Sequence, residues 1–387
     1  MKPRLWPFAA LSAGYFAHIG FFNPYLPLWL KDMGFGLLAI SLMTSLQSAT
    51  RLFAPYLWGW LSDHTGHRVW WLRYCGTASL LVSLGLWWPW SVASSVGLFC
   101  VLLLLFTHTS AMMPLNEAAL AQWVSQAGGF DARRYGRIRL WGSLGFLVTV
   151  LLAGAWFERD GLDTFPWWSL LTLLAVVASV WVMPATSETP HPQHGRLQVW
   201  PILRQPAVAW FFVAGFFHVL AHVFIYIFFS LYLDELGYSK ASIGWLWAVG
   251  VVVEIAWFFS QGRWLPRLPL TRWLWLVSAL MTLRMALTAG WADQAWVLWL
   301  AQLAHAFTFA THHSVCMAWL NRHFPGRLIG RGQALYTVLC YGLSGVAAGV
   351  LGGAVSMRWG LAAVFWLATG AAALATVSVW VLARRKA

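Results

Sequence analysis

Apolar runs long enough to cross a bilayer constrain this chain more than any other feature. A helix needs about 20 consecutive apolar residues to span the hydrocarbon of a membrane. Backbone polar groups cannot stay unpaired in lipid, so each run is expected to be a helix. The runs cover approximately residues 5–30, 37–58, 69–90, 92–122, 138–157, 166–184, 206–233, 240–261, 271–291, 294–320, 332–356 and 359–382. The sequence therefore predicts an all-α membrane protein with twelve transmembrane helices.

The scarcity of charge excludes a soluble protein. Only 10% of the 387 residues are charged, whereas a soluble protein carries about 25%. The net charge of +13 does not indicate a nucleic-acid partner, because the basic residues lie in short links and form no soluble face. The partner that this composition predicts is the lipid bilayer.

The basic residues also predict an orientation. With both termini in the cytoplasm, 18 of the 25 lysines and arginines fall in cytoplasmic links and only 4 on the other side. Such a bias is typical of the cytoplasmic side of a membrane protein. The first apolar run is too long for a cleavable signal peptide. We expect a monomer in a bacterial inner membrane, with an even number of spans.

One long polar connection, 185–205, divides the chain. It separates six predicted helices in residues 1–184 from six in 206–387. The two parts match weakly at an offset of 203 residues, for example Leu28 with Leu231 and Gly59 with Gly262. Two pseudo-symmetric six-helix bundles are therefore expected.

The link between the second and third runs has the sequence GWLSDHTGHR, from Gly59 to Arg68. Its glycines allow tight turning, and its charges can meet helix ends. A polar hairpin of this kind occurs in any membrane protein with several spans. The spacing of Gly59, Leu61, Asp63, Gly66 and Arg68 nevertheless resembles the loop that marks the major facilitator superfamily of transporters. That resemblance implies a conformational latch formed by Gly59, Asp63, Gly66 and Arg68.

Ionisable groups inside membrane spans are costly and point to function. Glu254 and Arg284 lie in the middle of the eighth and ninth spans. A carboxyl group poised between lipid and an arginine can carry a proton; the alternative is a structural ion pair that joins the two helices. Arg51, at the matching position of the first half, is expected to pair across the interface of the two halves, to bind an anionic substrate or to reach for a membrane face.

A second possible pair lies in the first half. Glu117 is at one end of the fourth span, and Arg139 opens the fifth. We expect the two side chains to pair. Gly142 and Gly145 give the fifth helix a surface for close packing.

The histidines gather on four predicted helices. Seven of the 12 lie inside spans, and these spans are the first, fourth, seventh and tenth. His218 and His222 have a spacing that can bind metal, but no nearby acid or cysteine completes a site, so neither a metal nor another cofactor is expected. His305 and His312 share a helix face. A single histidine in a span is more often a packing residue. The seven are His18, His108, His218, His222, His305, His312 and His313.

Polar residues of the first two spans are further candidates for substrate binding. Asn23 and Tyr25 lie beside Pro24 in the first span, and Gln47 lies in the second. Prolines inside a span remove backbone hydrogen bonds, so a flexible, cavity-facing segment is expected there.

Three stretches resemble the phenylpropionate permease family, which neighbours the lactose-type and nucleoside proton symporters. They are YGRIRLWGSLG from Tyr135, LAHAFTFATHH from Leu303 and PLNEAALA from Pro114. The resemblance implies a proton site made of Glu254, Arg284 and His305, and a substrate-side pair of Glu117 and Arg139. The sequence departs from the sugar symporters one turn after His305, where Thr308 stands in place of an acid.

The function that follows is proton-driven symport of a small organic substrate. An aromatic monocarboxylate such as phenylpropionate is the first expectation, because internal arginines and histidines can bind a carboxylate. We expect His218, His222 and His312 to contribute contacts to it. A sugar or a nucleoside is the alternative. A drug exporter, a membrane enzyme that uses the histidine pairs and a transport-like sensor fit the residues less well.

Overall fold

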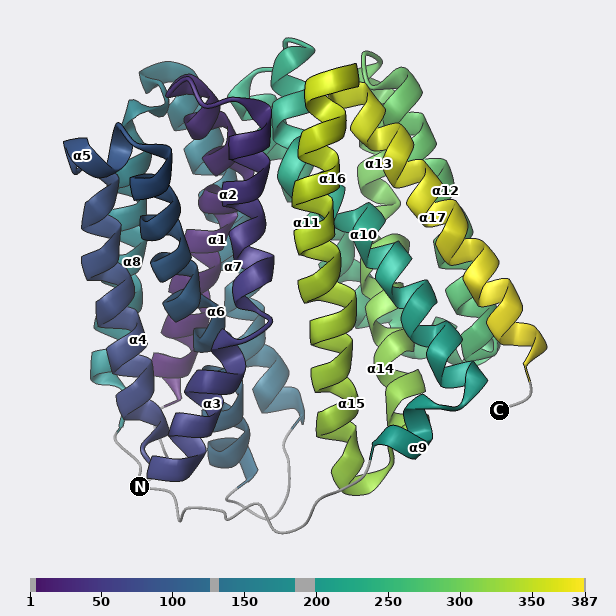
Figure 1. Ribbon diagram of the computed structural model, residues 1–387. Coiled ribbons are helices and arrows are strands. Elements are labelled where there is room, and N and C mark those ends of the chain that lie inside the picture. The colour runs from purple at the N-terminus through teal and green to yellow at the C-terminus, as the bar shows by residue number, and fades with distance from the viewer. Residues whose placement is uncertain (1–4, 126–131, 185–198, 386–387) are drawn as a thin grey trace. The chain divides into compact units, whose positions relative to one another are not determined.

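The computed structural model describes residues 5–125, 132–184 and 199–385. These residues form helices joined by short turns, and they contain no strand (Figure 1). The first part of the chain forms α1 (Trp6–Asp32), α2 (Leu37–Thr50), α3 (Ala54–Thr65), α4 (Arg68–Ser83), η1 (Leu84–Leu86), α5 (Pro89–Val92), α6 (Ser95–Ser125), α7 (Ala132–Asp160), η2 (Leu162–Thr164) and α8 (Phe165–Val182).

The second part adds short turns and six further spans. They are α9 (Trp200–Leu203), α10 (Pro206–Glu235), α11 (Lys240–Trp264), η3 (Leu265–Arg267), α12 (Leu270–Trp291), α13 (Ala295–Leu303), η4 (Ala306–Thr311), α14 (His312–His323), η5 (Gly326–Leu328), α15 (Ile329–Tyr336), η6 (Thr337–Gly342), α16 (Leu343–Trp359) and α17 (Leu361–Arg384).

Within the described residues, nine helical segments are long and apolar enough to cross a membrane. The remaining predicted spans correspond to α1, α4 and the segment from α13 to α14. The prediction of an all-α membrane protein with twelve transmembrane helices is confirmed.

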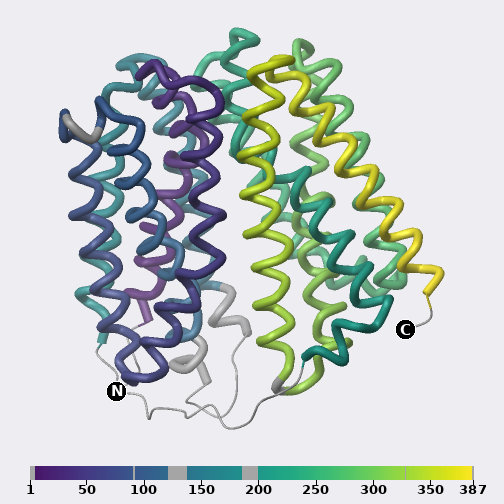
Figure 2. The backbone as a smooth tube through the Cα atoms, in the orientation of Figure 1, coloured from purple at the N-terminus to yellow at the C-terminus, as the bar shows by residue number. Residues whose placement is uncertain are grey.

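The chain packs as two compact units, which Figure 2 traces in colour from purple to yellow. Unit 1 comprises residues 1–35 and 50–194, and unit 2 comprises 36–49 and 195–387. The predicted bundles, 1–184 and 206–387, follow the order of the chain and stay a prediction. Most of the predicted connection 185–205 lies outside the described residues.

The second predicted span is broken. Helix α2 ends at Thr50, and α3 begins at Ala54. Pro55 lies in the first turn of α3, where its ring fits; inside a continuous helix it would remove a hydrogen bond and strike the carbonyl four residues earlier. Arg51 therefore sits in a helix break, where the sequence predicted an unbroken span.

The predicted loop from Gly59 to Arg68 is mostly helical, so that expectation was wrong. Helix α3 continues through Gly59 and Asp63 to Thr65. Gly66 ends the helix in the left-handed conformation, with φ of 68°, which glycine adopts at little cost. Arg68 bridges the turn with an ion pair to Asp63, whose Oδ1 lies 3.1 Å from the guanidinium.

Helix α1 is continuous through Pro24 and Pro27, and the expected flexibility of this segment stays a prediction. Pro24 and Pro27 are buried in this helix. Helix α7 packs closely beside α1. A Cβ at Gly145 would overlap the Ala13 carbonyl oxygen, and one at Gly142 would lie 2.7 Å from the Phe16 ring. These contacts confirm the predicted packing surface on α7.

Replacing Gly145 with alanine should therefore destabilise the protein. The added methyl group has no room beside the α1 backbone, and overpacking of this kind costs about 1–3 kcal/mol. We expect a lower melting temperature when unfolding in detergent is monitored by tryptophan fluorescence. Gly370→Ala is the matched control, because a Cβ there would meet no atom within 4 Å. An unchanged melting temperature in Gly145→Ala would contradict the close approach.

Candidate functional site

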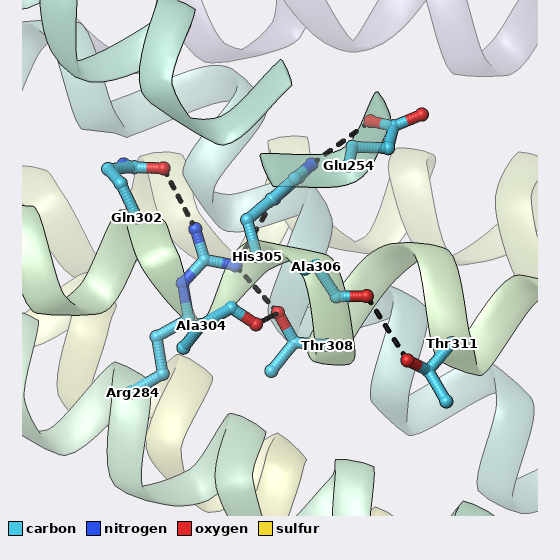
Figure 3. A network of polar contacts seen from close by, with 8 residues as sticks. All are labelled: Glu254, Arg284, Gln302, Ala304, His305, Ala306, Thr308 and Thr311. Atoms are coloured by element: carbon cyan, nitrogen blue, oxygen red, sulfur yellow. Dashed lines mark hydrogen bonds and ion pairs between the residues drawn. The ribbon is translucent and has the colours of Figure 1, made fainter. Parts of the chain in front are cut away.

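A buried arginine is the centre of the polar network in unit 2. The Arg284 side chain comes from α12 and is only 2% exposed. Its guanidinium donates to Gln302 Oε1 at 3.1 Å and to Thr308 Oγ1 at 2.9 Å (Figure 3). A third contact, of 3.5 Å, reaches Nδ1 of His305. All three partners are uncharged acceptors on one neighbouring segment, α13 to η4.

Glu254, the acid expected to lie beside Arg284, is separated from it by the side chain of His305. Glu254 of α11 places Oε2 3.5 Å from Nε2 of His305, and no ion pair joins Glu254 directly to Arg284 among the described residues. His305 lies between them, so the three residues form a chain (Figure 3). Nε of Arg284 has no hydrogen-bond partner within the part of the chain that the structure describes. Among these residues, the buried cation is thus held by neutral groups and contacts no carboxylate.

The contacts of His305 define its tautomer. A guanidinium only donates hydrogen bonds, so Nδ1 of His305 must accept from Arg284. The ring proton is then on Nε2 and points toward the Glu254 carboxylate. The imidazole in this arrangement is neutral and is bound on both sides.

His218 and His312 stack on each other. Their ring centroids are 3.7 Å apart, with an angle of 7° between the planes. Nε2 of His218 donates to the Thr308 carbonyl at 2.8 Å, and Nδ1 faces the Ser278 hydroxyl at 3.2 Å. His312 approaches Cys316 at 3.6 Å. Protein atoms thus occupy both nitrogens of His218, and its proposed role in substrate binding stays a prediction, as does that of His312.

His222 differs from its neighbours. It is 4% exposed, yet neither ring nitrogen has a hydrogen-bond partner among the described residues. Its ring lies 5.3 Å from His305, 4.9 Å from Tyr226 and 5.4 Å from Phe309. A buried polar group without a partner is costly. The predicted role of His222 in substrate binding stays a prediction.

The helix that carries His305 is distorted at this site. Residues of η4 form a π-helical segment, Ala306–Thr311. Such segments occur frequently at functional sites. Thr308 uses both of its oxygens here, because its hydroxyl accepts from Arg284 and its carbonyl accepts from His218. The π segment therefore joins Arg284 to His218.

Unit 1 contains a separate charged pair. Nε of Arg139 lies 3.3 Å from Oε1 of Glu117, and both side chains are more than one-third exposed. The Arg139 guanidinium also lies 4.4 Å from the centre of the Phe16 ring. The predicted pairing of Glu117 with Arg139 is thus present in the structure. Arg51 is half-buried at the break after α2.

The other predicted site residues are buried or half-buried, and several of them form hydrogen bonds to protein atoms. Tyr25 is fully buried, and its hydroxyl donates to the Val150 carbonyl at 3.2 Å. Asn23 and Gln47 are half-buried. His18 contacts the Thr172 hydroxyl at 3.0 Å, and Nδ1 of His108 donates to the Leu104 carbonyl of its own helix. The role of Asn23, Tyr25 and Gln47 in substrate binding remains a prediction.

The sequence interpretation missed two groups that bind Arg284. Gln302 is an uncharged amide, and its place one turn before His305 was a usable signal. Thr308 was noted only as a substitute for an acid, although it accepts a hydrogen bond from Arg284. Among the described residues, no group of three or more His, Cys, Asp or Glu side chains could bind a metal.

Comparison with known proteins places this site in a transporter framework. Residues 7–368 match the MFS_1 like family, a family of the major facilitator superfamily. A probable 3-phenylpropionic acid transporter of Escherichia coli is 27% identical over 346 residues, covering 86% of each chain. A maltose permease of Geobacillus stearothermophilus is 26% identical, covering 90% of this chain and 86% of its own.

Solved structures show the same fold. A single-substitution variant of the nucleoside transporter NupG superposes with a TM-score of 0.84 at 15% identity, covering 97% of this chain and 99% of its own. A D-xylose–proton symporter gives a TM-score of 0.72 at 12% identity, covering 98% and 96%. Because the sequence identities are only 15% and 12%, these structural similarities show the fold alone.

Replacing Gln302 with leucine should destabilise unit 2. The change removes the acceptor at 3.1 Å and leaves a buried N–H of Arg284 unpaired, which costs about 1–3 kcal/mol. We expect a lower melting temperature in detergent. The exposed Gln294 contacts its neighbour Asp293, so Gln294→Leu is the control. Equal melting temperatures for the two variants would mean that Gln302 does not hold the guanidinium.

Proposed function

Because the chain belongs to the MFS_1 like family of bacterial multi-pass membrane transporters, we propose that it is a proton-coupled symporter of a small aromatic monocarboxylate. The observation that carries this proposal is the buried guanidinium of Arg284, which neutral residues hold without a contacting carboxylate. Burying a charge is costly unless the charge is paired and hydrogen-bonded. A carboxylate substrate supplies the missing counter-charge.

The surroundings of Arg284 favour an aryl group on that carboxylate. His222 offers two unpartnered ring nitrogens, and Phe309 stacks on His305 with 5.1 Å between ring centroids. Tyr226 and Trp247 extend this aromatic wall. Aromatic rings pack well on one another in offset or edge-on arrangements. The similarity to the probable 3-phenylpropionic acid transporter points to the same substrate class.

We assign proton coupling to the chain of Glu254, His305 and Arg284. Glu254 is 24% exposed, so its carboxylate can exchange a proton with water. A proton passed to His305 places N–H groups on both ring nitrogens, and Nδ1 can then no longer accept from Arg284. Protonation therefore releases one arm of the guanidinium toward the substrate carboxylate. Substrate and proton favour each other's binding, as symport requires.

The remaining roles in this proposal belong to unit 1. Glu117 and Arg139 contribute polar contacts to the substrate, and Arg51 adds positive charge. The Asp63–Arg68 pair, with Gly59 and Gly66, serves as a conformational latch in alternating access. Uptake into the cell across the inner membrane, with both termini cytoplasmic, completes the proposal.

A neutral sugar is the second candidate, and the similarity to a maltose permease favours it. A sugar would use hydrogen bonds and aromatic stacking without neutralising Arg284. The charge of the substrate therefore separates the two candidates, and both can be tested in the same proteoliposomes.

Uptake into proteoliposomes tests the coupling. With an inward proton gradient, the wild-type protein should accumulate phenylpropionate, and without the gradient it should only equilibrate it. Glu254→Gln should abolish accumulation and retain exchange of labelled for unlabelled substrate, because the amide cannot carry the proton. Glu235→Gln removes an exposed carboxylate of the same unit and should accumulate normally. Full accumulation by Glu254→Gln would remove this residue from the mechanism.

Substrate charge tests the role of Arg284. We expect phenylpropionate to bind about 10- to 100-fold more tightly than its neutral amide, which corresponds to the roughly 1.5–3 kcal/mol of a hydrogen bond to a charged group. Arg284→Gln should remove this preference in a competition assay. Arg358, which lies 5.1 Å from the Trp359 ring, provides the control Arg358→Gln. Equal binding of acid and amide to the wild-type protein would favour the neutral-sugar candidate.

A further inference from the structure

A cavity lies at the end of unit 2 that contains the end of α17, and its lining does not include Arg284 or the hydrogen-bond partners of Arg284. It has a volume of about 380 Å³, which is within the range of about 300–1,000 Å³ typical of small-ligand pockets. Its lining comes from the start of α10, from η3 and the start of α12, and from the ends of α14 and α17. Figure 1 places this region beside the label of the C-terminus.

The lining of this cavity has two chemical parts. One part is apolar and includes Leu265, Leu268 and Leu382. The other is cationic, with the exposed side chains of Arg322 and Arg385. Trp319 and His323 also line the cavity, and the centroids of their rings are 3.6 Å apart. A ligand that fits both parts must carry an anionic group and an apolar group.

The charged side chains at this end of unit 2 are all positive. Residues 199–210, 258–275, 316–335 and 378–385 contain no Asp or Glu. Seven arginines of these segments form no ion pair with the described residues. They are Arg204, Arg263, Arg267, Arg272, Arg322, Arg384 and Arg385.

The cavity arginines differ from several of their neighbours. Arg204, Arg267 and Arg384 each lie over a tryptophan ring, at 5.3, 4.2 and 3.5 Å from its centre. Within the described part of the chain, Arg322 and Arg385 have no such ring contact. Their guanidinium groups are therefore the ones available to an anion in the cavity.

Tryptophans mark this end of unit 2 as a membrane interface. Trp200, Trp264, Trp275 and Trp380 are all more than 40% exposed. Exposed tryptophans gather at the level of the lipid head groups. An anionic group at that level, attached to an apolar chain, describes a phospholipid.

We propose that this cavity is a binding site for an anionic phospholipid. The phosphodiester pairs with Arg322 and Arg385, and the first part of an acyl chain lies along Leu265, Leu268 and Leu382. The first turn of α12, which also lines the cavity, presents the positive end of its dipole to the phosphate. Basic pockets between transmembrane helices bind acidic lipid head groups by the same chemistry. The site is independent of the substrate and of proton coupling.

Lipid titration of delipidated, full-length protein in detergent tests this site. Native mass spectrometry and melting temperature should both show tighter binding of dioleoyl phosphatidylglycerol than of dioleoyl phosphatidylcholine. The double variant R322Q/R385Q should weaken binding of the acidic lipid about 30-fold, which corresponds to about 1 kcal/mol for each arginine. The variant R322K/R385K keeps both charges and should retain most of the binding.

A matched control is available at the same end of the unit. R267Q/R384Q also removes two arginine charges, but these side chains do not line the cavity, so it should retain binding of the acidic lipid. Equal loss in the two double variants would mean diffuse surface attraction and would overturn the site. Equal binding of the two lipids would also overturn it. The same shift with inorganic phosphate or glycerol phosphate alone would assign the cavity to a free anion.

Discussion

The absence of water in the bilayer is the constraint on which the rest of this structure depends. Every backbone group there must find a partner within the protein, and polar side chains obey the same rule. Many serine and threonine hydroxyls donate to a carbonyl one turn earlier in their own helix, as Thr109 and Ser79 do. His108 also bonds to its own helix. Eight buried side-chain atoms of the described residues have no hydrogen-bond partner, and three of them, the two His222 nitrogens and Nε of Arg284, lie in the polar network of unit 2.

The two charged clusters satisfy this constraint in different ways. In unit 1, Glu117 and Arg139 neutralise each other at 3.3 Å and remain partly exposed, so their net charge is zero. In unit 2, Arg284 is buried among neutral acceptors, and the acid reaches it only through His305. The opposite charges thus touch directly in unit 1, whereas in unit 2 a neutral imidazole lies between them.

Much of the fold could be predicted from the sequence because apolar length is a strong physical signal. The twelve spans and the Glu117–Arg139 pair followed from it, since a charge inside a span needs a partner. Neutral groups carry a weaker signal, so Gln302 and Thr308 were missed as partners of Arg284. The break at Arg51 was missed because the run stays apolar through it, although Pro55 was visible. Which face of a helix each histidine presents depends on helix geometry, and η4 departs from the regular α-helix.

The π segment η4 also has a mechanical consequence. A π turn holds one residue more than an α turn, and it can move along a helix when one hydrogen bond at a time changes partner. Each residue that passes from one form to the other turns the adjoining segment by roughly 100°, the rotation per residue of an α-helix. His305 lies just before η4, and His312 begins the helix after it. The extra residue therefore gives α13 a way to rotate His305 relative to His312 while the ends of the span stay anchored in the membrane.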